Sequence, residues 1–171
     1  MDKIIGKDAE GFEILTAAMR SLLNQYPGLP EGESIKYEEL KDDGGIAFSA
    51  DSGALIYTER EDILGRYHQT CRYPFFVVYR IASDRERYKL SIQTFLDTLG
   101  KWICREPAVL NGSQIQLTEY PALTGNRKIK RITRENAYGL QPQENGVQDW
   151  LLPVTVQYES LIDNDFELRE A

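Results

Sequence analysis

Histidine and cysteine are both scarce in this chain. Among its 171 residues there is one histidine, His68, and there are two cysteines, Cys71 and Cys104. So few cysteines exclude a disulfide scaffold, and because no Cys-x-x-Cys pair is present, a zinc site of that kind is excluded too. We expect two buried thiols in a chain that works in a reducing compartment.

The spacing of His68 and Cys71 argues against nucleophilic catalysis. Both lie in a segment with strand character, where residues three apart point to opposite faces. Glycine-rich phosphate-binding motifs are absent. The run Asp42-Asp43-Gly44-Gly45 lacks the ligand spacing of a calcium loop and is typical of a solvated turn. The sequence therefore predicts no enzyme, no metal site and no cofactor.

Long apolar runs are also missing. No window approaches the roughly 20 apolar residues that a membrane-spanning helix needs. The N-terminal residues 1–19 include acids where a secretion signal would be apolar, so we expect a cytoplasmic chain that is not exported. A net charge of −7 disfavours a general nucleic-acid binder, because such proteins neutralise phosphates with Lys and Arg.

What is present is an ordinary globular composition. Apolar residues make up 42% of the chain and charged residues 27%. The length favours a single domain over residues 1–171, long enough to bury a core without disulfides. The last residues, 163–171, are acidic and are expected to be a flexible end.

Two segments have helical periodicity. From about Asp8, the expected N-cap, to Gln25, apolar residues recur on one face, and Pro27-Gly28-Leu29-Pro30 should end the helix. A second amphipathic helix is expected from the capping box Ser83-Asp84-Arg85-Glu86 to about Cys104.

Strand character recurs between and after the helices. The expected strands are at residues 35–40, 46–48, 54–57, 67–81, 115–120, 127–134 and 151–158. Asp51-Ser52-Gly53 is interpreted as a hairpin-like break, residues 59–65 as a loop and residues 137–148 as a long polar connection.

The apolar centre of the strand at residues 67–81 predicts a central strand covered on both faces for part of its length. Short links favour antiparallel pairing. We therefore expect an α+β domain, with a mainly antiparallel sheet and two amphipathic helices packed on one face.

One segment stands out for its charge, Arg127-Lys128-Ile129-Lys130-Arg131-Ile132-Thr133-Arg134, with five basic residues and no acid. Strand alternation places Lys128, Lys130 and Arg134 on one face and Arg127 and Arg131 on the other, unless a bulge intervenes. Two interpretations remain open. The charges either keep an edge strand from aggregating or form an electrostatic contact surface for another protein.

The C-terminal end has the opposite charge. Residues 159–171 contain five acids and one base. Opposite patches on one chain permit a head-to-tail contact between copies, and such contacts form a ring when the rotation closes. Charge segregation therefore gives the hypothesis of a homo-oligomer.

Three segments together resemble a known family. They are the amphipathic stretch from Phe12 to Tyr26, the strand Tyr73-Pro74-Phe75-Phe76-Val77-Val78-Tyr79-Arg80 with the helical Phe95-Leu96-Asp97-Thr98-Leu99-Gly100-Lys101-Trp102, and the closing Gly146-Val147-Gln148-Asp149-Trp150-Leu151-Leu152-Pro153-Val154-Thr155-Val156-Gln157-Tyr158. Their order along the chain and their residue composition resemble those of the tail terminators, or tail-completion proteins, of long-tailed phages, including minor capsid-type proteins of prophages.

The resemblance implies a structural protein of the virion, assembled in the host cytoplasm. It would form a hexameric ring on the tail tube, stop polymerisation of the major tail tube protein, and bind the head-completion (stopper) protein. DNA would pass through the ring without being read, and the family supplies no catalytic residue.

Other functions are also considered. A different neck protein, a head–tail connector or stopper, would also form a ring but would bind on the portal side. An enzyme or small-molecule binder would need a deep pocket with convergent polar groups. A nucleic-acid-binding protein that used the basic strand would lose affinity steeply with salt.

Overall fold

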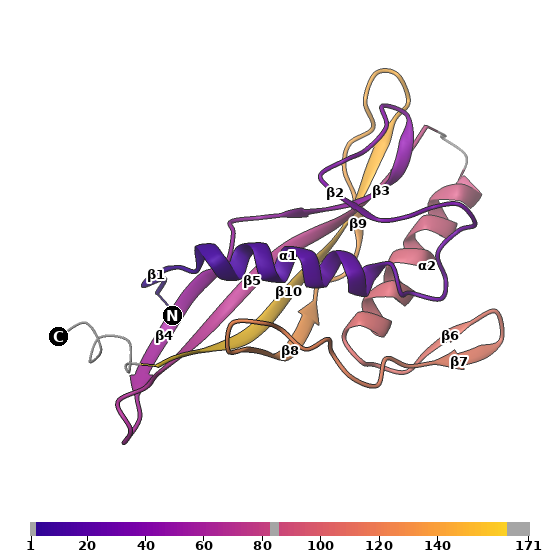
Figure 1. Ribbon diagram of the computed structural model, residues 1–171. Helices are drawn as coiled ribbons and strands as arrows, with labels where there is room; N and C mark the ends of the chain where they lie inside the picture. The colour runs from indigo at the N-terminus through magenta and orange to yellow at the C-terminus, as the bar shows by residue number, and fades with distance from the viewer. Residues whose placement is uncertain (1–2, 83–85, 164–171) are drawn as a thin grey trace.

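The computed structural model describes residues 3–82 and 86–163 (Figure 1). In chain order the elements are β1 (Gly6–Lys7), α1 (Ala9–Leu23), β2 (Lys36–Tyr37), β3 (Gly44–Ala50), β4 (Leu55–Glu61), β5 (Tyr67–Ile81), α2 (Glu86–Ile103), β6 (Ala108–Leu110), β7 (Ser113–Ile115), β8 (Arg127–Arg134), β9 (Tyr138–Gly139) and β10 (Gln148–Ile162). The expected capping box at 83–86 lies largely outside the described residues, as does the expected flexible end from residue 164 onward.

Eight strands of the described part form one sheet around a long central pair. The main order is β1-β4-β5-β10-β8, with β3 also beside β5, β2 beside β3, and β9 beside β10. Strands β5 and β10 are antiparallel neighbours over 15 register pairs. Only the short β2–β3 pairing in this part of the chain is parallel. The α+β fold with a mainly antiparallel sheet is confirmed.

Strands β3 and β4 do not form the hairpin that the sequence suggested. They lie end to end along β5, with β3 paired to its second half and β4 to its first half. The break at Asp51-Ser52-Gly53 lies beside Pro74, whose carbonyl accepts from the Asp51 amide at 3.0 Å. Because proline has no amide N–H, an uninterrupted ladder would lose a hydrogen bond at this point.

Two local predictions were wrong. The expected loop at residues 59–65 is partly strand, because β4 continues to Glu61 before a short turn reaches β5. The strand expected at 115–120 is replaced by a hairpin, β6–β7, that ends at Ile115. Its two turn residues, Asn111 and Gly112, both have positive φ, as a type I′ turn requires.

Helix α1 is held at both ends by side chains. The Asp8 carboxylate accepts from the Gly11 amide at 3.0 Å, which confirms the N-cap. At the other end Asn24 bonds both to the Arg20 carbonyl and to the backbone of Ile35, at 2.7–2.8 Å. The helix therefore stops at Leu23, two residues before the predicted end.

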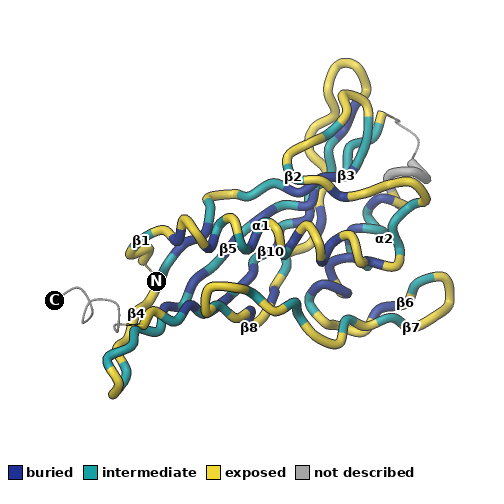
Figure 2. Tube along the Cα trace, viewed as in Figure 1, coloured by how far each residue is buried: buried dark blue, intermediate teal, exposed yellow. Residues whose placement is uncertain are grey.

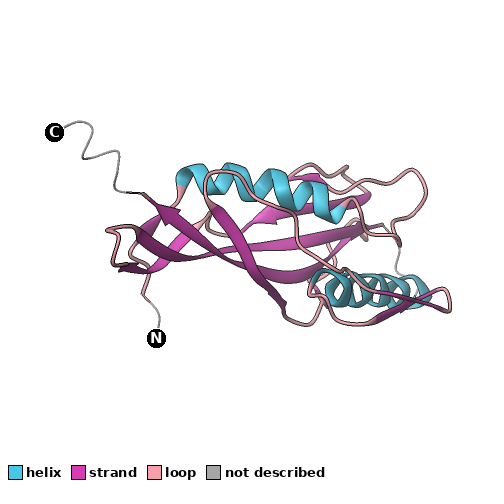
Figure 3. Ribbon diagram, turned by 60° about the horizontal axis from the view of Figure 1, so that its bottom comes forward, coloured by secondary structure: helices cyan, strands magenta, loops and turns pink. Residues whose placement is uncertain are grey.

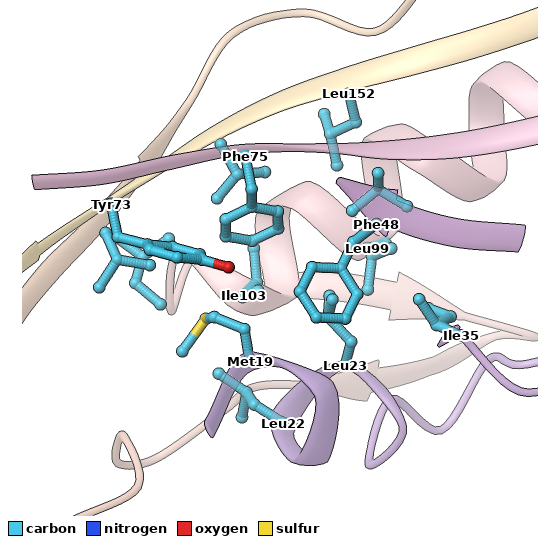
Figure 4. Close-up of a cluster of buried hydrophobic side chains, with 14 of the residues drawn as sticks. Met19, Leu22, Leu23, Ile35, Phe48, Tyr73, Phe75, Leu99, Ile103 and Leu152 are labelled. Carbon is cyan, nitrogen blue, oxygen red and sulfur yellow. The ribbon is translucent and has the colours of Figure 1, made fainter. Parts of the chain in front are cut away.

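The core lies between the two helices and one face of the sheet. Figure 3 shows α1 running along the strands and α2 beside one end of the sheet. Figure 2 shows that buried residues alternate with less buried ones along the central strands, and that one side of α1 is exposed to solvent. Figure 4 shows the contact region, where strand side chains meet both helices; it labels Met19, Leu22, Leu23, Ile35, Phe48, Tyr73, Phe75, Leu99, Ile103 and Leu152. None of the described helices is long and apolar enough to cross a membrane.

Candidate functional site

The basic segment forms β8, an edge strand paired only with β10 in the described part of the chain. The pairing shifts register between Gln157 and Tyr158, so that Gln157 lies opposite Arg131 while Tyr158 lies opposite Ile129. Lys130 is therefore the extra residue of a β-bulge. A bulge changes which later residues share a face, and this one separates the strand into two halves.

The bulge corrects the predicted faces of the five basic residues. Arg127 and Arg134 lie on the helix-covered face, because their partners Ser160 and Val154 are buried. Lys128 and Arg131 lie on the opposite face. The prediction had grouped Lys128 with Arg134, and Arg127 with Arg131. Both groupings are wrong because simple alternation fails across the extra residue.

Arg127 is a buried structural residue. Its guanidinium donates to both oxygens of Asp8, at 2.9 Å from Nε and 2.7 Å from Nη2, and only 8% of each side chain is exposed. The Tyr158 hydroxyl donates to the same carboxylate at 2.8 Å. Burial alone would raise the pKa of Asp8, but the hydrogen bonds from Arg127 and Tyr158 outweigh it and keep the pKa low.

Arg134 also has a structural role. Its Nε lies 3.2 Å from the Glu106 carboxylate, and 17% of its side chain is exposed. The side chain crosses α2 at Gly100, where an added Cβ would stand 2.5 Å from Arg134 Cδ. Glycine at this helical position therefore allows the edge strand to approach the helix closely.

The other three basic residues are available to solvent. Lys130 Nζ lies 3.1 Å from Glu159, and half of its side chain remains exposed. Lys128 and Arg131 are exposed, and neither forms an ion pair with a described residue. A surface cavity of about 630 Å³ adjoins this strand and is lined in part by Arg105, Tyr120 and Leu123.

A second cluster of charges lies on the same outer face, around His68. Its Nε2 is 2.9 Å from Asp62 and its Nδ1 is 3.2 Å from Glu159. Carboxylates only accept, so a neutral ring can donate to one of them while a protonated ring donates to both. The hydrogen bond from His68 is the main cause of a lowered pKa at Asp62, and Lys130 is the main cause at Glu159.

The outer face is apolar in its middle. Phe76 and Val78 of β5 pair with Pro153 and Leu151 of β10, so their side chains share the face opposite the helices. All four are only half-buried, and none belongs to the core formed by the described residues. The prediction that this central strand is covered on both faces was therefore wrong. The composition of this strand showed apolar residues on both of its faces. It could not show that both helices pack on the same face of the sheet.

The structure separates the residues that nucleophilic chemistry would need together. Cys71 is fully buried on the core face, while His68 lies on the opposite face, as their spacing predicted. Burial raises the pKa of each thiol, Cys71 and Cys104, to about 11, so both remain protonated near neutral pH. No group of three or more His, Cys, Asp or Glu that could hold a metal is found among the described residues.

The described residues therefore present three surface features: an exposed basic edge, a charged cluster around His68, and an apolar sheet face. Comparison with known proteins gives no match, either to a model of a protein family or to a curated sequence.

Proposed function

We propose that this chain is a structural protein of a phage-like tail, a terminator that assembles as a ring on the end of the tail tube. The observation that carries the proposal is the apolar outer face of the sheet, where Phe76, Val78, Leu151 and Pro153 are half-buried and lie outside the core of the described residues. An apolar sheet face beside polar edges marks a protein–protein contact, because burying it stabilises the complex by roughly 25 cal/mol per Å².

The arrangement of the segments that resemble tail terminators supports the same function. The aromatic strand and the closing segment, far apart in sequence, are the paired β5 and β10 at the centre of the sheet (Figure 1). Helices α1 and α2, which carry the remaining resemblance, belong to the same core, and Tyr26, in the segment after α1, packs on Phe95 and Trp102 of α2. The resemblance therefore falls on one continuous structural unit.

In this function the ring has two partners and no reaction to perform. It binds the last layer of the major tail tube protein, stops further polymerisation, and presents its other side to the head-completion protein. DNA passes through the lumen unread. The protein assembles in the host cytoplasm and is retained in the neck of the virion.

The test is polymerisation of the cognate tail tube protein with a small amount of this chain. We expect addition to end tube growth, so that mean tube length falls as the ratio of chain to tube protein rises. A Phe76→Asp variant, altered on the apolar outer face, should lose this effect, whereas Val109→Asp on the distant β6–β7 hairpin should keep it. Tubes of unchanged length with bare ends would reject the proposal.

A further inference from the structure

Strand β8 is the last strand at its end of the sheet within the described residues, and a cavity lies beside it. It pairs with β10 on one side only. The cavity has a volume of about 630 Å³ and lies between the first half of β8 and the segment 119–123. We call this cavity the basic slot, because four of its five charged lining residues are basic: Arg105, Arg127, Lys128 and Lys130, against Glu119. Proteins usually charge or cover an open strand edge, which keeps other chains from pairing with it.

The basic slot has positive charges that the described residues leave unpaired. Two of its four basic residues have an acid partner, in the pairs Arg127–Asp8 and Lys130–Glu159. The other two, Arg105 and Lys128, are exposed and form no ion pair with a described residue. Glu119 is exposed as well and offsets one of these two charges. The slot therefore keeps an excess of positive charge, which suits an anionic segment.

The backbone of Arg105 supports a contact role for this residue. Arg105 follows α2 with a φ of 61°, a left-handed value that helix ends usually give to glycine. Its guanidinium lies over the ring of Tyr120, 5.6 Å from the centroid, and its carbonyl accepts from Gln116 at 3.0 Å. Residues held in sparsely populated backbone conformations cluster at ligand contacts. Here such a residue lines the cavity with an unpaired charge.

The chain carries an acidic segment next to the slot. Strand β10 ends at Ile162 beside the start of β8, where the Leu161 amide donates to the Asn126 carbonyl at 2.9 Å. Residues 164–171, which lie outside the described part, contain three acids and one base. Extended chain spans about 3.3 Å per residue, so this segment reaches about 26 Å, whereas crossing β8 takes about 10 Å. The segment is therefore long enough to reach the slot on the far side of β8.

The residue pattern of the segment matches the slot in polarity as well as in charge. Asp165 and Glu167 alternate with Phe166 and Leu168. In an extended conformation the two acids therefore point to one side and the two apolar side chains to the other. The slot combines the lysines of β8 with the apolar side chains of residues 120–123. Each side of the segment has residues of a suitable kind to contact.

We propose that residues 164–171 fold back into the basic slot of their own chain and cover the open edge of β8. A short connection to β10 gives the segment an effective concentration in the millimolar range, so a contact too weak for separate molecules is populated within one chain. A partner that uses the basic edge must first displace the segment. The inference does not depend on the proposed ring.

The test is the rate at which a small acetylating reagent modifies Lys128 in the full chain, followed lysine by lysine with mass spectrometry. Lys7, exposed on β1 at the opposite edge of the sheet, is the internal control. We expect Lys128 to react about tenfold more slowly than in the variant Asp165→Asn, Glu167→Gln, Glu170→Gln, with no change at Lys7. In about 1 M salt, where the screening length is about 3 Å, the difference should shrink. Equal rates at low salt would overturn the proposal.

Two further variants and a dilution test where the segment binds. Phe166→Ser with Leu168→Ser keeps every charge, and Arg105→Gln changes the slot alone. Both should lose the protection of Lys128, and protection retained in either would contradict docking in the slot. For the unmodified chain the protection should be unchanged over an about 100-fold dilution, because a contact within one chain does not depend on concentration. Protection that falls on dilution would assign the segment to a neighbouring copy and overturn the same-chain contact.

Discussion

The two faces of the central sheet are built from neighbouring residues with different surroundings. Phe75 is buried against both helices, while Phe76, the next residue, is half-buried on the other side. Arg127 is enclosed with Asp8, whereas Lys128 faces solvent without an ion pair in the described chain. Residue type does not distinguish the buried residues from the partly exposed or exposed ones here. The difference is which face the helices cover.

The largest difference between the faces should be seen in the two phenylalanines. We expect Phe75→Ala to lower the free energy of unfolding by about 3–5 kcal/mol, because it leaves a cavity in the core. Phe76→Ala should cost the isolated chain clearly less, yet weaken assembly. Urea denaturation of both variants measures the first effect. Equal losses of stability would show that the outer face is also part of the core.

The next effect concerns the buried ion pair. Asp8→Ala removes the partner of Arg127 and Tyr158 and the cap of α1, so we expect a loss of about 3 kcal/mol or more. Thermal and urea unfolding would both report it. The matched control is Arg131→Ala, on the outer face of the same strand, which should change stability by less than about 0.5 kcal/mol. A loss below 1 kcal/mol for Asp8→Ala would contradict the structural role of the pair.

Lowering the pH should reduce the free energy of unfolding through carboxylates on both faces of the sheet. Asp8, Asp62 and Glu159 each have a lower pKa in the folded chain than their ordinary values of 3.8, 3.8 and 4.5. The unfolded chain therefore binds more protons in acid, so this stability is complete above about pH 5 and is lost as the pH falls below 4. Unfolding followed from pH 7 to 3 measures the loss. The Asp8→Asn variant should lose less stability over the same pH range. An equal loss would show that Asp8 does not contribute to the acid sensitivity.

A smaller effect is expected from the partly exposed charges around His68. Glu159→Gln weakens contacts to Lys130 and His68, but solvent screens both, so we expect a loss of about 0.5–1 kcal/mol. Raising the salt concentration should reduce the difference from the unmodified chain. A cost as large as that of Asp8→Ala would mean that this cluster, too, is structural.

The smallest effect on stability should come from the free basic residues. We expect the double variant Lys128→Glu, Arg131→Glu to unfold within about 0.5 kcal/mol of the unmodified chain, since neither residue has an ion pair in the described part. Self-association of the double variant, compared at low and high salt, would show whether these charges contribute to a contact. A large loss of stability would show that Lys128 and Arg131 have a structural role.

The sequence predicted the bounds of the helices and strands better than the pairing and packing around them. Helical periodicity located α1 to within two residues at its C-terminal end, and the ends of β5 and β8 were predicted correctly. The bulge at Lys130 was not predictable, because it depends on the register with β10 and not on the β8 sequence itself.

The interaction partners of the candidate residues could not be predicted from the sequence either. Arg127 is paired with a residue 119 positions away, Asp8, and no local pattern connects the two. The exposed tip at Ile63 was missed because residues 59–65 look like an ordinary polar loop. Long-range packing decides the pairing of Arg127.

The most direct measurement is the assembly state of the unmodified chain. Light scattering after size exclusion, with electron micrographs of the same fraction, should be made with and without cognate tail tubes. The account predicts closed rings of about six subunits, or a single ring on each tube end. A chain that stays monomeric in both conditions and leaves the tube ends bare would contradict it.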